Sequence, residues 1–116
     1  MAIIRKIKAR KKSDEESYSV TVTVGNDKTG AVSTVDLKIP TVKGQPVPNP
    51  KTMTLTYSGM DGSDKVYSYD YLGFSDDAVG YSYNMTATMK SAKGTQVGSS
   101  STESVTVEAA TEEMAS

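Results

Sequence analysis

Residues 18–39 read YSVTVTVGNDKTGAVSTVDLKI, and this stretch holds the clearest structural signal in the chain. Valine alternates with threonine over residues 20–24, and a second apolar alternation runs from Val35 to Ile39. Between the two runs, residues 25–30 are rich in Gly, Asn and Asp. A period of two is typical of a half-buried strand, and the intervening composition is typical of a turn. We therefore predict a β-hairpin here.

The same period of two returns along the rest of the chain. It recurs in four further segments: residues 53–57, 66–71, 81–89 and 105–107. All four prolines fall within residues 40–51, which we expect to form an extended crossing loop because proline cannot donate to a strand ladder. Six evenly spaced strands without a convincing helix predict an all-β domain, either a sandwich or a small barrel.

Charge divides the chain into a basic start and an acidic remainder. The first twelve residues hold six of the thirteen basic residues and none of the fourteen acidic ones. We predict a basic N-terminal arm over residues 1–16, a β-sandwich over 17–109 and an acidic tail over 110–116. The isoleucines within the arm are compatible either with a seventh strand or with one or two helical turns.

The basic arm is the strongest functional signal in the sequence. One interpretation is docking onto an acidic protein surface, with Ile3–Ile7 added as a strand to the partner. A second is contact with nucleic acid phosphates, and a third is a solubilising tail that meets only its own acidic body. We favour docking, because a tail that serves only solubility has no use for isoleucines. The predicted docking residues are Ile3, Ile4, Arg5, Lys6, Ile7, Lys8, Arg10, Lys11 and Lys12.

Composition argues against an enzyme. The chain has no histidine, cysteine or tryptophan, so the commonest general base, the thiolate nucleophile and the usual metal ligands are missing. We expect no catalytic residue, no metal and no cofactor.

No apolar run reaches the length of a secretory signal or of a membrane helix. We therefore expect synthesis in a cytoplasm and no membrane partner.

Tyrosines form the second candidate site. Six of the seven lie between Tyr57 and Tyr83. Tyr67, Tyr69 and Tyr71 share one face of a predicted strand, opposite to Val66. They are either core residues in a chain with only three leucines or an exposed face that binds a glycan or a peptide. The alternation alone does not choose between these faces.

The C-terminal third resembles the end of an immunoglobulin-like or fibronectin type III domain. In such domains a leucine-bearing loop precedes a Tyr-x-apolar-x-apolar-x-Ala strand. The matching residues here are Leu72, Tyr81, Tyr83, Met85 and Ala87, followed by Gly94 in the next turn and by Val105 and Val107 in the last strand. The resemblance implies an antiparallel immunoglobulin-like β-sandwich of six to seven strands, with Tyr81 as the tyrosine-corner residue.

Small immunoglobulin-like domains without cysteine are similar to modules displayed on tailed-phage virions. By this resemblance we expect a non-enzymatic structural module, an accessory (decoration) protein that docks on a capsid or tail surface through its basic arm. Its expected location is the virion, or otherwise the cytoplasm. The alternative is a glycan- or peptide-binding module that uses the tyrosine-rich face.

Overall fold

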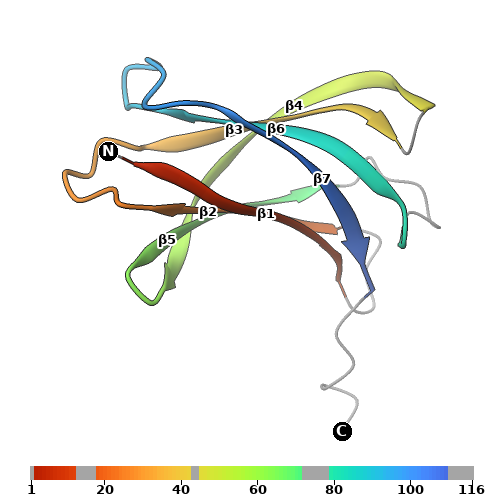
Figure 1. The fold of residues 1–116 in the computed structure, drawn as a ribbon, viewed down its shortest axis with the longest axis horizontal. Helices are drawn as coiled ribbons and strands as arrows, with labels where there is room; N and C mark the ends of the chain where they lie inside the picture. Colours follow the sequence, from red (N-terminus) through yellow and green to blue (C-terminus); the bar gives the residue numbers. More distant parts are fainter. Residues whose placement is uncertain (1, 13–17, 43–44, 72–78, 110–116) are drawn as a thin grey trace, which may run out of the picture.

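The computed structural model describes residues 2–12, 18–42, 45–71 and 79–109 (Figure 1). Within these ranges the chain forms seven strands and no helix, which confirms the all-β prediction. The strands are β1 (Ile3–Lys11), β2 (Tyr18–Gly25), β3 (Thr34–Val42), β4 (Gln45–Asp61), β5 (Asp64–Tyr71), β6 (Ser82–Lys90) and β7 (Ser101–Glu108).

The strands hydrogen-bond in one closed ring. Their order is β1-β2-β5-β4-β3-β6-β7, and β7 pairs with β1 again. Every neighbouring pair is antiparallel except β1 and β7, which run parallel. The described part of the chain is therefore a small barrel.

The barrel interior is filled by the residues that the alternation predicts. Each strand points every second side chain inward, so the valines of β2 and the apolar residues of β3, β4, β6 and β7 meet in one core. Burying such side chains stabilises the fold by about 1.5–3 kcal/mol each. The largest fully buried side chains are Tyr18, Val20, Val22, Val24, Val35, Leu37, Ile39, Leu55, Tyr67, Met85, Met89 and Val107.

The predicted hairpin between residues 20–24 and 35–39 is wrong, although both segments are strands. β2 pairs with β1 and β5, whereas β3 pairs with β4 and β6. The connection crosses from one wall of the barrel to the other (Figure 1). Alternation reports which face of a strand is buried, but every strand offers the same backbone groups, so it does not report the partner.

The expected sandwich of two separate sheets is corrected to a closed barrel. One closure comes from β4, whose residues pair with β3 up to Thr56 and with β5 from Thr56 onward. The other closure comes from β1, which bonds to β2 on one edge and to β7 on the other. Long strands that change partners join what would otherwise be two sheet edges.

The proline-rich segment is also more regular than expected. β3 continues to Val42 and β4 begins at Gln45, so most of the predicted crossing loop is strand. The ladder between β3 and β4 is irregular between Ile39 and Thr41, and Pro48 and Pro50 fall in the corresponding gap. Proline is tolerated there because no ladder donor is required of it.

Candidate interaction surface

Strand β1 contains most of the predicted docking residues. Of the two predicted alternatives for this segment, a strand or one or two helical turns, the structure has the strand. β1 is antiparallel to β2 over eight residue pairs. Ile7 is only 6% exposed and Ala9 is fully buried, so both belong to the chain's own core. Ile3 is 41% exposed and Ile4 is half-buried. The segment is thus a wall of the barrel, and only part of it is available to a partner.

Most of the cations of this segment form ion pairs with the chain's own acidic residues. Three of them reach past β2 to the β4–β5 hairpin and to β5, and one pairs with β7. The pairs are Arg5–Asp64 at 3.1 Å, Lys6–Asp61 at 3.9 Å, Lys12–Asp70 at 3.1 Å and Arg10–Glu108. Lys11 lies over the ring of Tyr18, with its Nζ 5.0 Å from the ring centroid. Solvent-exposed pairs contribute about 0–1 kcal/mol each, so we expect these pairs to add little to the stability of the barrel.

Small residues on the outer face of β2 make these long-range ion pairs possible. Ser19, Thr21, Thr23 and Gly25 alternate along the strand, opposite to the buried valines. A Cβ atom on Gly25 would lie 2.1 Å from Nε of Arg5, so the guanidinium crosses β2 at a position where no side chain stands. Any larger residue at position 25 would have to displace the Arg5 guanidinium.

Lys8 differs from the other cations of β1. It is exposed, and its ladder partner on β2 is the neutral residue Thr21. Within the described part of the chain Lys8 forms no ion pair. Its positive charge is therefore available to a second molecule.

The junction between β1 and β7 is the shortest ladder of the ring. It consists of the pairs Ala9↔Val107 and Arg10↔Glu108, at one end of both strands. From there the strands diverge toward the end of the barrel that holds the start of β1 (Figure 1). We call the facing edges of residues 3–8 of β1 and 101–106 of β7 the open seam. No ladder bond joins these two edges.

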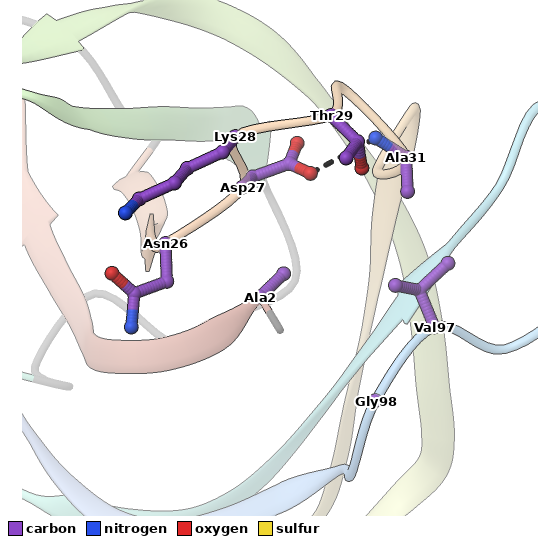
Figure 2. A pocket seen from close by; sticks show the side chains of 8 residues that line it. All are labelled: Ala2, Asn26, Asp27, Lys28, Thr29, Ala31, Val97 and Gly98. Carbon is purple, nitrogen blue, oxygen red and sulfur yellow. Dashed lines mark hydrogen bonds between the residues drawn. The ribbon is translucent and has the colours of Figure 1, made fainter.

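A cleft of about 460 Å³ lies at the wide end of the open seam (Figure 2). The start of β1, the β2–β3 connection and the β6–β7 connection converge on it. We call it the end cleft. Its lining residues are Ala2, Asn26, Asp27, Lys28, Thr29, Ala31, Val97 and Gly98. Ala2, Ala31 and Val97 make part of its wall apolar, whereas Lys28 is exposed and has no ion pair among the described residues.

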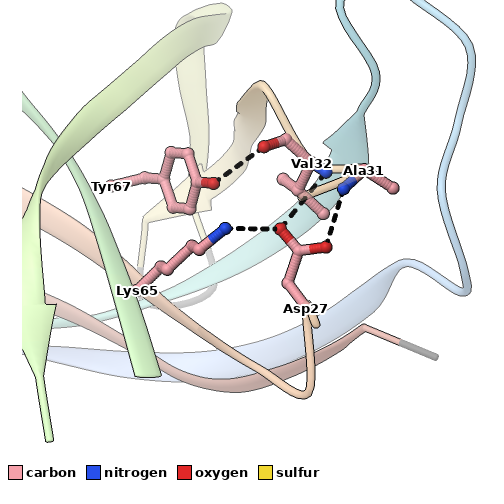
Figure 3. A network of polar contacts seen from close by, with 5 residues as sticks. All are labelled: Asp27, Ala31, Val32, Lys65 and Tyr67. Carbon is pink, nitrogen blue, oxygen red and sulfur yellow. Dashed lines mark hydrogen bonds and ion pairs between the residues drawn. The ribbon is translucent and has the colours of Figure 1, made fainter. Parts of the chain in front are cut away.

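A polar network fixes the β2–β3 connection beside this cleft (Figure 3). The Asp27 carboxylate, whose side chain is 2% exposed, accepts from the backbone N–H of Ala31 at 2.9 Å and of Val32 at 3.3 Å. It also accepts from Nζ of Lys65 on β5 at 3.2 Å. The Tyr67 hydroxyl donates to the Val32 carbonyl at 3.0 Å. From the sequence, Asp27 was predicted only to lie in a turn. Asp side chains in loops often accept hydrogen bonds from nearby backbone N–H groups, as Asp27 does here from residues four and five positions later.

Burial of the Tyr67 ring raises the pKa of its hydroxyl, and the negative charge of Asp27 and the neighbouring Tyr57 raise it further. The neutral hydroxyl is the form that donates to the Val32 carbonyl. The network therefore ties the β2–β3 connection to β5 through Tyr67 and Lys65. A cleft with fixed walls loses less conformational entropy when a ligand binds.

The tyrosines divide between core and surface. Tyr67 is fully buried, so its face of β5 points inward, whereas Tyr69 on the same face is 41% exposed. The pairs between β4 and β5 end at Ser68, so Tyr69 lies beyond the ladder that covers Tyr67. Tyr71 pairs through its backbone with β2, and its side chain lies outside the described set.

Tyr57 is an exposed aromatic residue that the sequence did not single out. It is 52% exposed on β4 and makes an edge contact with the Tyr67 ring, with 6.0 Å between centroids. Met60 on the same hairpin is 54% exposed. Tyr81, the predicted tyrosine-corner residue, is 37% exposed, and its carbonyl accepts from Val107 N–H at 2.9 Å.

Among the described residues, no three His, Cys, Asp or Glu side chains are grouped closely enough to hold a metal ion. The same residues include no helix that is long and apolar enough to cross a membrane. No protein-family model, no curated protein and no solved structure matches this chain.

Proposed function

We propose that this protein is a non-enzymatic interaction module that docks onto a larger protein assembly through the outer surface of β1. The observation that carries this proposal is the combination on β1 of Lys8, an exposed cation with no ion pair among the described residues, and a ladder to β7 of only two described pairs. Positive charge steers the encounter with an acidic partner, and free backbone edges give it a place to attach.

We also propose that the barrel is a closed variant of the immunoglobulin-like arrangement. Support comes from the order of neighbours: β1-β2-β5-β4 follows the A-B-E-D sheet of that arrangement, and β3-β6-β7 follows its C-F-G sheet. On this basis, and by the sequence resemblance, the assembly we propose is a phage capsid or tail, with this chain as a virion accessory protein. Fold alone does not determine function, so the assignment needs its own test.

The test cannot be removal of residues 1–12, because Ile7 and Ala9 would leave the core and the barrel would lose a wall. Charge reversal of Lys8 leaves the core intact. The control is Lys38→Glu on β3, another exposed lysine on a strand of the opposite wall.

The experiment expresses the chain together with the capsid and tail genes of its source genome and measures co-sedimentation with the assembled particles. We expect the natural chain and Lys38→Glu to sediment with particles, and Lys8→Glu to sediment less, with a loss that grows with salt concentration. A chain that stays at the top of the gradient at low salt contradicts the virion proposal.

A second candidate function is recognition of a glycan or peptide by exposed aromatic residues. The observation in its favour is the exposure of Tyr57 and Tyr69 beside the β4–β5 hairpin. Glycan-array binding that is lost in Tyr57→Ala and Tyr69→Ala would support it.

Nucleic acid is the weaker alternative, because Arg5, Arg10 and Lys12 already pair with carboxylates that phosphates would have to displace.

A further inference from the structure

We infer that the open seam accepts an extended segment of the partner as an additional strand between β1 and β7. This inference rests on the proposed docking function and names its site and the chemistry of its ligand. The partner segment runs antiparallel to both strands, carries small apolar side chains at alternate positions and carries acidic side chains at the positions between them.

The backbone of the seam supplies the first argument. β1 is bonded to β2 over its whole length, but to β7 only at Ala9 and Arg10. β7 is bonded to β6 from Ser101 to Thr106, and its other edge has no ladder partner over these residues in the described chain. Two strand edges that have no ladder partner among the described residues therefore border the open seam. Edges of this kind bind extended peptides by strand addition.

The direction of the strands supplies the second argument. β1 and β7 are parallel, which is the less stable pairing per residue. A segment placed between them in the opposite direction forms an antiparallel ladder with each neighbour. β1 keeps its eight pairs with β2 during this addition, so the wall of the barrel does not have to come apart.

The side chains beside the seam determine which partner fits. On the inner side, Ile4 and Val97 are half-buried and pack against the core, and Ala2 opens onto the end cleft. Apolar side chains of the partner would cover the exposed parts of Ile4 and Val97. Glu103 also points to the inner side of β7 and is half-buried, with Ser101 Oγ donating to its carboxylate at 3.4 Å. An acidic residue of the partner is disfavoured at that inner position.

The outer side carries the opposite preference. Lys6 and Lys8 project outward from β1, and Thr102, Ser104 and Thr106 project outward from β7. Lys6 contacts Asp61 only at 3.9 Å, and Lys8 has no ion pair among the described residues. Carboxylates on the outer face of the added strand would meet these two lysines, and charge complementarity selects the acidic partner.

The experiment uses the full chain and a synthetic probe peptide, Thr-Val-Glu-Val-Glu-Val-Thr, blocked at both ends. Amide chemical shifts and hydrogen exchange are measured by NMR during titration. We expect shifts and slower exchange at residues 3–8 and 101–106, and little change in β3 and β4. A version of the peptide with lysine in place of glutamate, and a scrambled version, are the matched ligands.

Lys8→Glu is expected to weaken binding of the acidic peptide by about three- to tenfold, as for the loss of one exposed ion pair and the gain of a like charge. It should strengthen binding of the lysine peptide, while Lys38→Glu leaves both affinities unchanged. The inference is overturned if the acidic peptide causes no shifts at its solubility limit, if the shifts lie elsewhere, or if Lys8→Glu binds it equally well.

The two proposals fail in different ways. Peptide binding at the seam by a chain that never sediments with particles refutes the virion function and leaves the seam intact. Sedimentation that is lost in Lys8→Glu, without any peptide effect at the seam, supports docking through β1 and refutes strand addition.

Discussion

The substitution Ile7→Ala tests whether β1 is a wall of the barrel or a separate arm. Ile7 is 6% exposed and pairs with Val22, itself fully buried. The substitution removes three carbon atoms, which at about 0.8 kcal/mol each amounts to about 2.5 kcal/mol of lost transfer free energy. The cavity left behind adds to this, so we expect a total loss of about 3–4 kcal/mol in the free energy of unfolding.

Ile3→Ala is the matched control, because it makes the same chemical change on the same strand. Ile3 is 41% exposed, so the transfer term scaled to its buried part is about 1.5 kcal/mol, and no closed cavity forms. Lys8→Ala, at an exposed position, should change stability by less than about 0.5 kcal/mol.

Equilibrium urea denaturation, followed by far-ultraviolet circular dichroism, measures all three variants. The chain lacks tryptophan, so the usual fluorescence probe is absent. The role of Ile7 in the core is refuted if Ile7→Ala costs no more than Ile3→Ala. That result would mean that β1 does not contribute to the core and that residues 1–12 form an arm after all.

Three further predictions concern the polar contacts and use the same denaturation assay. Asp27→Ala should cost about 2–3 kcal/mol of unfolding free energy, because it leaves the partly buried Lys65 ammonium and two N–H groups without their acceptor. The control Asp36→Ala should cost less than about 1 kcal/mol. Equal costs for the two variants would contradict the role of the network. Gly25→Ala should displace the Arg5 side chain and cost less than about 1 kcal/mol of unfolding free energy. This cost should vanish in a protein that also carries Arg5→Ala. An unchanged cost would show that the effect of Gly25→Ala does not come from Arg5. Burial raises the pKa of Tyr67 in the folded state above its ordinary value of 10.0. The protonated hydroxyl therefore contributes fully to the free energy of unfolding below pH 10.0. This contribution is lost as the pH rises from 10.0 through the folded-state pKa. Tyr67→Phe should reduce this alkaline loss, and an identical pH dependence in both proteins would show that another group causes it.

The sequence predicted the strands and their buried faces well. The valines of β2 and the apolar residues of β3, β6 and β7 point inward as their alternation indicated. Tyr67 shows where such prediction ends, because either face of β5 was possible until its neighbours were known. Its face became the inner one when β2 placed Val22 opposite to it.

The candidate site was only partly predictable. The sequence identified the basic segment at the start of the chain, but not that Arg5, Arg10 and Lys12 would pair with acidic residues far along the chain. Such pairs depend on which strands become neighbours. Lys8 differs from the other cations because its cross-strand neighbours Thr21 and Ser68 are neutral.

The amino-acid sequence by itself determined that this chain is an all-β domain, which residues of each strand share a face and where its positive charge is concentrated. A period of two fixes the orientation of side chains because successive residues of a strand point to opposite faces. Only the tertiary structure decided that β2 and β3 lie in opposite walls, that β1 closes a barrel and that its ladder to β7 stops after two pairs. Every strand presents the same N–H and C=O groups, so the choice of partner follows from how the whole core packs.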